Sequence, residues 1–124
     1  MAAFTVGSVE DQVRTALLDT YEDAYRYAPK EIYYAMRDGL NHIRNMRPEA
    51  KYVDGELVDL NFPTIPTSAE TTAIRATTVN MEDRWLEAIV FYCIHRMYTK
   101  DDTDTQNQQL AATYYSMFER SLNA

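Results

Sequence analysis

The clearest periodicity of the chain lies between residues 29 and 46, where apolar and polar residues follow a helical spacing. Pro29 suits a first helical turn, and Pro48 disfavours helix at the residue before it. Gly39 lies inside the segment, and we expect it to permit a close approach of another helix. Four apolar residues repeat at i, i+4, i+8 and i+11 on one face: Ile32, Met36, Leu40 and Ile43. The pattern predicts an amphipathic helix over 29–46.

A second helical pattern lies near the start of the chain. Ser8 is a candidate N-cap, and Glu10 and Asp11 follow in the first turn, where the helix dipole favours acids. The residues that recur on one face are Val9, Val13, Ala16 and Leu17. We therefore predict a helix over about 8–19, followed by the polar connector "TYEDAYRYA".

Two further helices are predicted at about 81–98 and 105–122. The first contains "WLEAIVFYCIHRMY", which is apolar around most of its circumference and is typical of a helix buried from several sides. The second has an apolar face that is wider than one core contact requires, so either the domain packs very tightly or part of these helices meets other subunits. The candidate interface residues are Tyr114, Tyr115, Phe118 and Leu122.

The segment 51–78 interrupts the helical patterns. Asp54-Gly55, between two short β-compatible runs, predicts a small hairpin. The threonine-rich stretch 64–78 indicates an extended loop or a strand that needs a partner. The fold class we expect is mainly α: a single domain over 1–124, built as a bundle of about four helices with this hairpin or extended insertion between helices two and three.

Charge argues against one class of partner. The net charge is −7, so the chain lacks the excess of Lys and Arg that binds phosphate backbones tightly. The segment 52–74 contains four acidic residues and no Lys or Arg, which predicts an acidic loop surface. The four acids are Asp54, Glu56, Asp59 and Glu70. The single Cys93, the lack of a signal pattern and the lack of a long apolar run predict a protein of the reducing cytoplasm that spans no membrane.

Candidate catalytic and metal-binding patterns are weak. A calcium loop that starts at Asp102 requires Gly at its sixth position and Glu at its twelfth, but the chain has Asn107 and Thr113 there. We therefore interpret Asp101, Asp102 and Asp104 as turn and N-cap residues. Cys93 and His95 point to different sides of a helix, and His42 lies on another helix, which indicates a core thiol and a surface histidine. Three glycines cannot build a phosphate loop. We expect no enzyme, no cofactor and no metal.

Two stretches carry a resemblance to a known family. They are "APKEIYYAMRDGLNHIRNMRPEAK", with its helix-ending Arg-Pro turn, and "DRWLEAIVFYCIHRMYTKDDTDTQNQQLAATYYSMFERSL". Together with the short β-compatible excursion between them, they resemble the head-to-tail connector, or adaptor, proteins of tailed bacteriophages over most of residues 29–122. The threonine-rich stretch 64–78 has no clear counterpart in that pattern.

The resemblance implies a structural protein of the virion neck, assembled in the host cytoplasm. Such proteins form rings of about twelve subunits below the portal protein, prolong the DNA channel and present a platform for tail or nozzle proteins. An acidic channel wall would let packaged DNA pass without specific binding. The alternatives are a small cytoplasmic helical regulator that binds another protein, and an enzyme whose site is completed across subunits.

Overall fold

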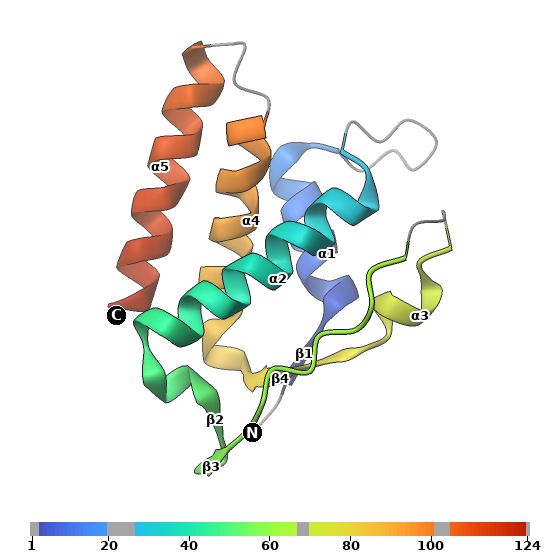
Figure 1. The fold of residues 1–124 in the computed structure, drawn as a ribbon. Helices are drawn as coiled ribbons and strands as arrows, with labels where there is room; N and C mark the ends of the chain where they lie inside the picture. Colours follow the sequence, from blue (N-terminus) through green and yellow to red (C-terminus); the bar gives the residue numbers. More distant parts are fainter. Residues whose placement is uncertain (1–2, 20–26, 67–69, 101–104, 124) are drawn as a thin grey trace.

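The computed structural model describes residues 3–19, 27–66, 70–100 and 105–123, and Asp101, Asp102 and Asp104 lie outside them. The predicted mainly α fold class is confirmed. Figure 1 shows the elements in chain order. They are β1 (Ala3–Thr5), α1 (Val6–Leu17), α2 (Pro29–Met46), the 3-10 turn η2 (Pro48–Lys51), β2 (Tyr52–Val53), β3 (Glu56–Leu57), α3 (Thr72–Arg75), β4 (Thr78–Glu82), the 3-10 turn η3 (Asp83–Trp85), α4 (Leu86–Lys100) and α5 (Thr105–Leu122).

The long helix α4 is the centre of the fold. Helices α1, α2 and α5 all pack against it, with α5 alongside and α2 crossing it (Figure 1). The predicted ranges of α2 and α5 are confirmed, and the four apolar residues of the α2 stripe are completely buried. Because α4 contacts three helices, its apolar circumference is used mostly within the chain.

At Gly39, α2 approaches α4 closely. A Cβ atom at this position would lie 2.6 Å from Cδ1 of Ile89 and 2.6 Å from Cδ2 of Tyr92, which is closer than carbon atoms approach one another. The predicted close helix approach is therefore confirmed.

Gly39→Ala is expected to lower the free energy of unfolding by about 1 kcal/mol, because overpacking costs about 1–3 kcal/mol and alanine returns about 1 kcal/mol in helix propensity. Urea unfolding followed by circular dichroism measures the change. Asn41→Ala, at an exposed position of the same helix, is the control and should be neutral or slightly stabilising. A Gly39→Ala variant that is as stable as the control would show that Ile89 and Tyr92 move away freely.

The start of α1 differs from the prediction. The N-cap is Thr5, and Ser8 lies three residues later, where the two residues exchange backbone-to-side-chain hydrogen bonds of 3.2 Å in a capping box. The helix therefore begins at Val6 and ends at Leu17, two residues earlier at each end than expected. Ala16, expected on the buried face, is exposed.

Residues 78–82 form strand β4 rather than the first turn of a helix, so the prediction of a helix from Met81 was wrong at this end. Val79 and Met81 are buried while the residues between and beside them are more exposed, which is the alternation of a strand. Strand β4 pairs antiparallel with β1, and the Val6 backbone N–H donates to the Thr77 carbonyl at 3.0 Å. The N-terminal strand thus ties α1 to the start of α4.

The predicted hairpin is present. Strands β2 and β3 pair antiparallel with Tyr52 opposite Leu57, and both turn residues, Asp54 and Gly55, have positive φ, as a type I′ turn requires. The hairpin lies against β4, and the Asp54 backbone N–H donates to Glu82 at 3.2 Å. Within 64–78, the described residues include one helical turn, α3, that the sequence pattern did not predict.

Helix α1 ends in an unfavourable conformation for its residue type. Leu18 has φ 56° and ψ 35°, the left-handed region, and its side chain is 89% exposed. Leu18→Gly is expected to raise the free energy of unfolding by about 1 kcal/mol, because glycine adopts this conformation without a steric cost. Differential scanning calorimetry measures the change in melting temperature. Ala16→Gly is the control and should lower the melting temperature, because glycine is unfavourable inside a helix. A lower melting temperature for Leu18→Gly would contradict it.

Candidate functional site

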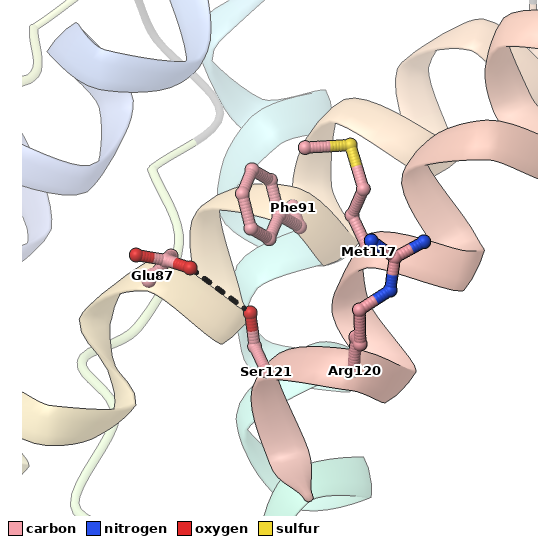
Figure 2. Close-up of a pocket in the computed structure, with 5 residues that line it drawn as sticks. All are labelled: Glu87, Phe91, Met117, Arg120 and Ser121. Atoms are coloured by element: carbon pink, nitrogen blue, oxygen red, sulfur yellow. Dashed lines mark hydrogen bonds between the residues drawn. The ribbon is translucent and has the colours of Figure 1, made fainter. Parts of the chain in front are cut away.

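A groove runs along α4 between α1 and α5, formed by two adjoining cavities that share Phe91 and Met117; we call it the α4 groove. The first cavity, about 270 Å³, is lined by Glu87, Phe91, Met117, Arg120 and Ser121 (Figure 2). The second, about 430 Å³, is lined by Asp11, Gln12, Thr15, Ala16, Val90, Phe91, Ile94, Tyr114 and Met117. At 100° per residue, Phe91 and Ile94 lie on the side of α4 opposite the residues that meet α2.

The α4 groove has an apolar floor and a polar rim. The rings of Phe91 and Tyr114 lie 6.1 Å apart on the floor, and Phe91 and Met117 lie between the charged side chains of Glu87 and Arg120 (Figure 2). The Ser121 hydroxyl donates to Glu87 at 3.2 Å, which links α5 to α4 at this end. An apolar floor with charges at the edge suits the side chains of another protein.

The structure separates the four predicted interface residues. Tyr114 lines the α4 groove, and the ring of Tyr115 lies 4.9 Å from that of His95 on another side of α5. Phe118 is 0% exposed and Leu122 is 2% exposed, so both belong to the chain's own core. The prediction that these two contact a partner is corrected, because a side chain without accessible surface cannot contact another molecule.

The groove residues of α1 were not predicted from the sequence. Phe91 was not singled out within the stretch "WLEAIVFYCIHRMY", and Val90 and Ile94, which also line the groove, are buried. Gln12, Thr15 and Ala16 form the α1 wall of the groove although they follow no apolar stripe. The available signal was the number of apolar positions on α4 and α5, which is larger than one core contact requires.

The predicted acidic residues are all exposed, but they do not form one patch. Asp54 and Glu56 lie on the β2–β3 hairpin, and Asp59 follows it. Glu70 precedes α3, which lies far from the hairpin (Figure 1). Hydrogen bonds from Thr72 hold the pKa of Glu70 below its usual value. The acidic surface therefore divides into a hairpin group and a separate carboxylate.

The predicted core thiol is confirmed, since Cys93 is fully buried and burial raises its pKa. The predicted surface histidine is only partly exposed: the Nδ1 atom of His95 lies 2.9 Å from the Ala111 carbonyl oxygen, so the ring packs between α4 and α5. Among the described residues, no group of three or more His, Cys, Asp or Glu side chains could hold a metal ion. The same part of the chain contains no helix that is both long and apolar enough to cross a bilayer.

A cluster of buried charges lies beside the groove, on the inner side of α1. Arg14 bonds to Glu10 at 2.9 Å and to Asp19 at 2.8 Å, and all three side chains are almost completely buried. Arg75 of α3 donates to Glu10 at 2.7 Å, and the Tyr33 hydroxyl of α2 donates to it at 2.6 Å. Burial and the bond to Glu10 raise the pKa of Tyr33. The cluster joins α1, α2 and α3.

Its position in the interior indicates a structural role for the charge cluster. The Glu10 carboxylate receives three donors, from Arg14, Arg75 and Tyr33, so its oxygens are occupied by the chain itself. The α4 groove, in contrast, is open, apolar and lined by three helices. We therefore take the α4 groove as the candidate functional site.

Comparison of the chain with protein-family models, with curated proteins and with solved structures found no match.

Proposed function

We propose that this chain is a ring-forming connector subunit of a tailed bacteriophage, which docks below the portal protein and receives a tail or nozzle protein. The observation that carries the proposal is the α4 groove. Phe91 and Met117 leave apolar surface open between α1 and α5, above buried core residues that include Val90. Apolar surface of this kind is typical of a protein that is buried against others.

The order of the elements supports the same proposal. Helix α2 ends at Met46, the Arg47-Pro48 pair leads into η2, and the small hairpin comes before α4 and α5. This is the order that the resemblance implies: a helix with an Arg-Pro end, a β excursion and a pair of helices. The α4–α5 pair carries both the quoted "WLEAIVFYCIHRMY" pattern and most of the groove.

The negative net charge favours a channel through which DNA passes without being bound. About twelve copies at −7 each would carry about −84, which repels phosphate backbones and also opposes association of free subunits. The exposed acids Asp59 and Glu70 are candidates for the channel surface. A preformed portal ring would hold neighbouring subunits at high effective concentration and so overcome their repulsion.

The proposal is tested by sedimentation velocity of the purified protein at low and at raised salt, with and without the portal protein of the same particle. We expect mainly monomer alone at low salt, more self-association when ions screen charges over about 10 Å at 0.1 M, and a ring when the portal is present. Cryo-electron microscopy of the mixture shows whether a ring is added to the portal.

Two outcomes would argue against parts of the proposal. If the protein stays monomeric and does not bind the portal under any condition, it is not a connector, and the alternative of a small protein-binding regulator is favoured. Stable rings at low salt without portal would keep the function but show that subunit contacts alone outweigh the charge repulsion.

A further inference from the structure

The β2–β3 hairpin carries an exposed apolar pair at one end of the molecule. Tyr52 and Leu57 are opposite one another in the antiparallel register, so their side chains lie on the same face of the hairpin. Tyr52 is 44% exposed and Leu57 is 65% exposed. The hairpin is held in place by β4 and by the bond from Asp54 to Glu82, so this pair is presented on an ordered support.

We propose that the Tyr52–Leu57 pair of one subunit inserts into the α4 groove of a neighbouring copy and thereby forms the contact that repeats around the ring. This inference rests on the proposed function and names the interface within it. The two surfaces are different parts of the same chain, so their contact is head-to-tail, which is the type of contact that closes into rings.

The positions of the two surfaces fit a ring. Subunits of a closed ring are related by rotation without a rise, so the two sides of a repeating contact must lie at the same height along the ring axis. The C-terminal end of α5 points toward the end of the molecule that carries the hairpin, and the hairpin extends beyond it (Figure 1). The first cavity of the groove lies at the C-terminal end of α5, since Arg120 and Ser121 belong to the last turn of this helix. Because the hairpin extends past the end of α5, the ring axis that brings the hairpin and this cavity to one height is inclined to α4 and α5 (Figure 1).

The two surfaces have complementary charge at one position, Arg120, while the exposed acids Glu87 and Asp11 also line the groove. The hairpin carries the acids Asp54 and Glu56 beside its apolar pair. Arg120 lies at the mouth of the groove beside Met117, and it is exposed (Figure 2). An acid of one copy can therefore meet a guanidinium of the next, which favours this register of the two chains over others.

Disulfide trapping tests the contact directly. Chains carrying Leu57→Cys are mixed with chains carrying Met117→Cys in the presence of portal, oxidised, and mapped by mass spectrometry. The buried Cys93 does not compete, because its thiol is inaccessible and its pKa is raised. Tyr34→Cys replaces Leu57→Cys in the control, since Tyr34 is 43% exposed but lies on α2. We expect at least about 10-fold more cross-linked dimer from the Leu57 pair.

The outcomes separate this inference from the proposed function. Three results would overturn the hairpin contact and leave the connector function standing. They are rings that form without the Leu57–Met117 cross-link, equal cross-link yields from the Tyr34→Cys control, and a cross-link from Met117→Cys to the portal. If the Leu57–Met117 cross-link forms between copies that do not bind the portal, the result would support the hairpin contact and count against the connector function. Neither ring nor cross-link would overturn both.

A charge exchange gives an independent measure. Arg120→Glu and Glu56→Arg are each expected to weaken subunit association by about 10-fold, and the double variant is expected to recover most of that loss. Sedimentation velocity at raised salt measures the association, and urea unfolding verifies that each variant folds. Single variants that both fold and associate normally would contradict the pairing of the hairpin with the groove mouth.

Discussion

Arg14→Met is expected to lower the free energy of unfolding by about 3–5 kcal/mol, because it removes the cation from a buried group of carboxylates. Arg14 lies between Glu10 and Asp19 at 2.9 and 2.8 Å, and also donates to the Tyr27 carbonyl at 3.1 Å. Methionine fills most of the volume but leaves two nearly inaccessible carboxylates without their main partner. Urea denaturation of the purified variant measures the loss.

Arg96→Met is the matched control for this prediction. Arg96 pairs with Asp38 at 3.6 Å on the surface, where both side chains are in contact with water. Removing such a pair should change the free energy of unfolding by less than about 1 kcal/mol. An Arg14→Met variant that behaves like this control would show that Glu10 and Asp19 reach water by a small rearrangement of α1.

Phe118→Ala is expected to destabilise the fold by about 3–5 kcal/mol, the range for truncating a fully buried phenylalanine. Its ring is in the core beside Tyr92, with ring centroids 5.2 Å apart. The neighbouring residue gives a control of the opposite kind. Met117→Ala, one position earlier in α5, should cost much less stability because Met117 lines the open groove, and it should instead weaken ring assembly.

Thermal unfolding and portal-binding assays of both variants distinguish core from interface on this helix. A Phe118→Ala protein that is fully stable but fails to assemble would reverse the two assignments and return Phe118 to the interface expected from the sequence.

The helices with long apolar periodicity were predictable from the sequence. Helix α2 was predictable because two prolines mark its ends and its stripe extends over three turns. Strands β1 and β4 were not, because each is only three to five residues long and the pairing joins residues such as Thr5 and Thr78. Short strands of this kind depend on tertiary contacts that a local pattern does not contain.

The candidate site was only partly predictable for a related reason. The sequence indicated that α4 and α5 had more apolar surface than one core contact requires, but the side of α4 that stays open depends on how the helix is rotated. That rotation follows from the contact of Gly39 with Ile89 and Tyr92. In the same way, the bond between Glu10 and Arg75 joins residues 65 positions apart, so the charges of α1 gave no sign that they were buried.

The pairing of β1 with β4 has a consequence for the order of folding. Helices α4 and α5 are adjacent in the sequence and form the largest contact of the fold, so this helical hairpin requires little chain entropy to close. Strand β1 and helix α1 are synthesised well before their partners β4 and α4. The apolar residues Val6, Val9 and Val13 therefore remain unburied until β4 and α4 follow, and their burial completes the folding of the chain.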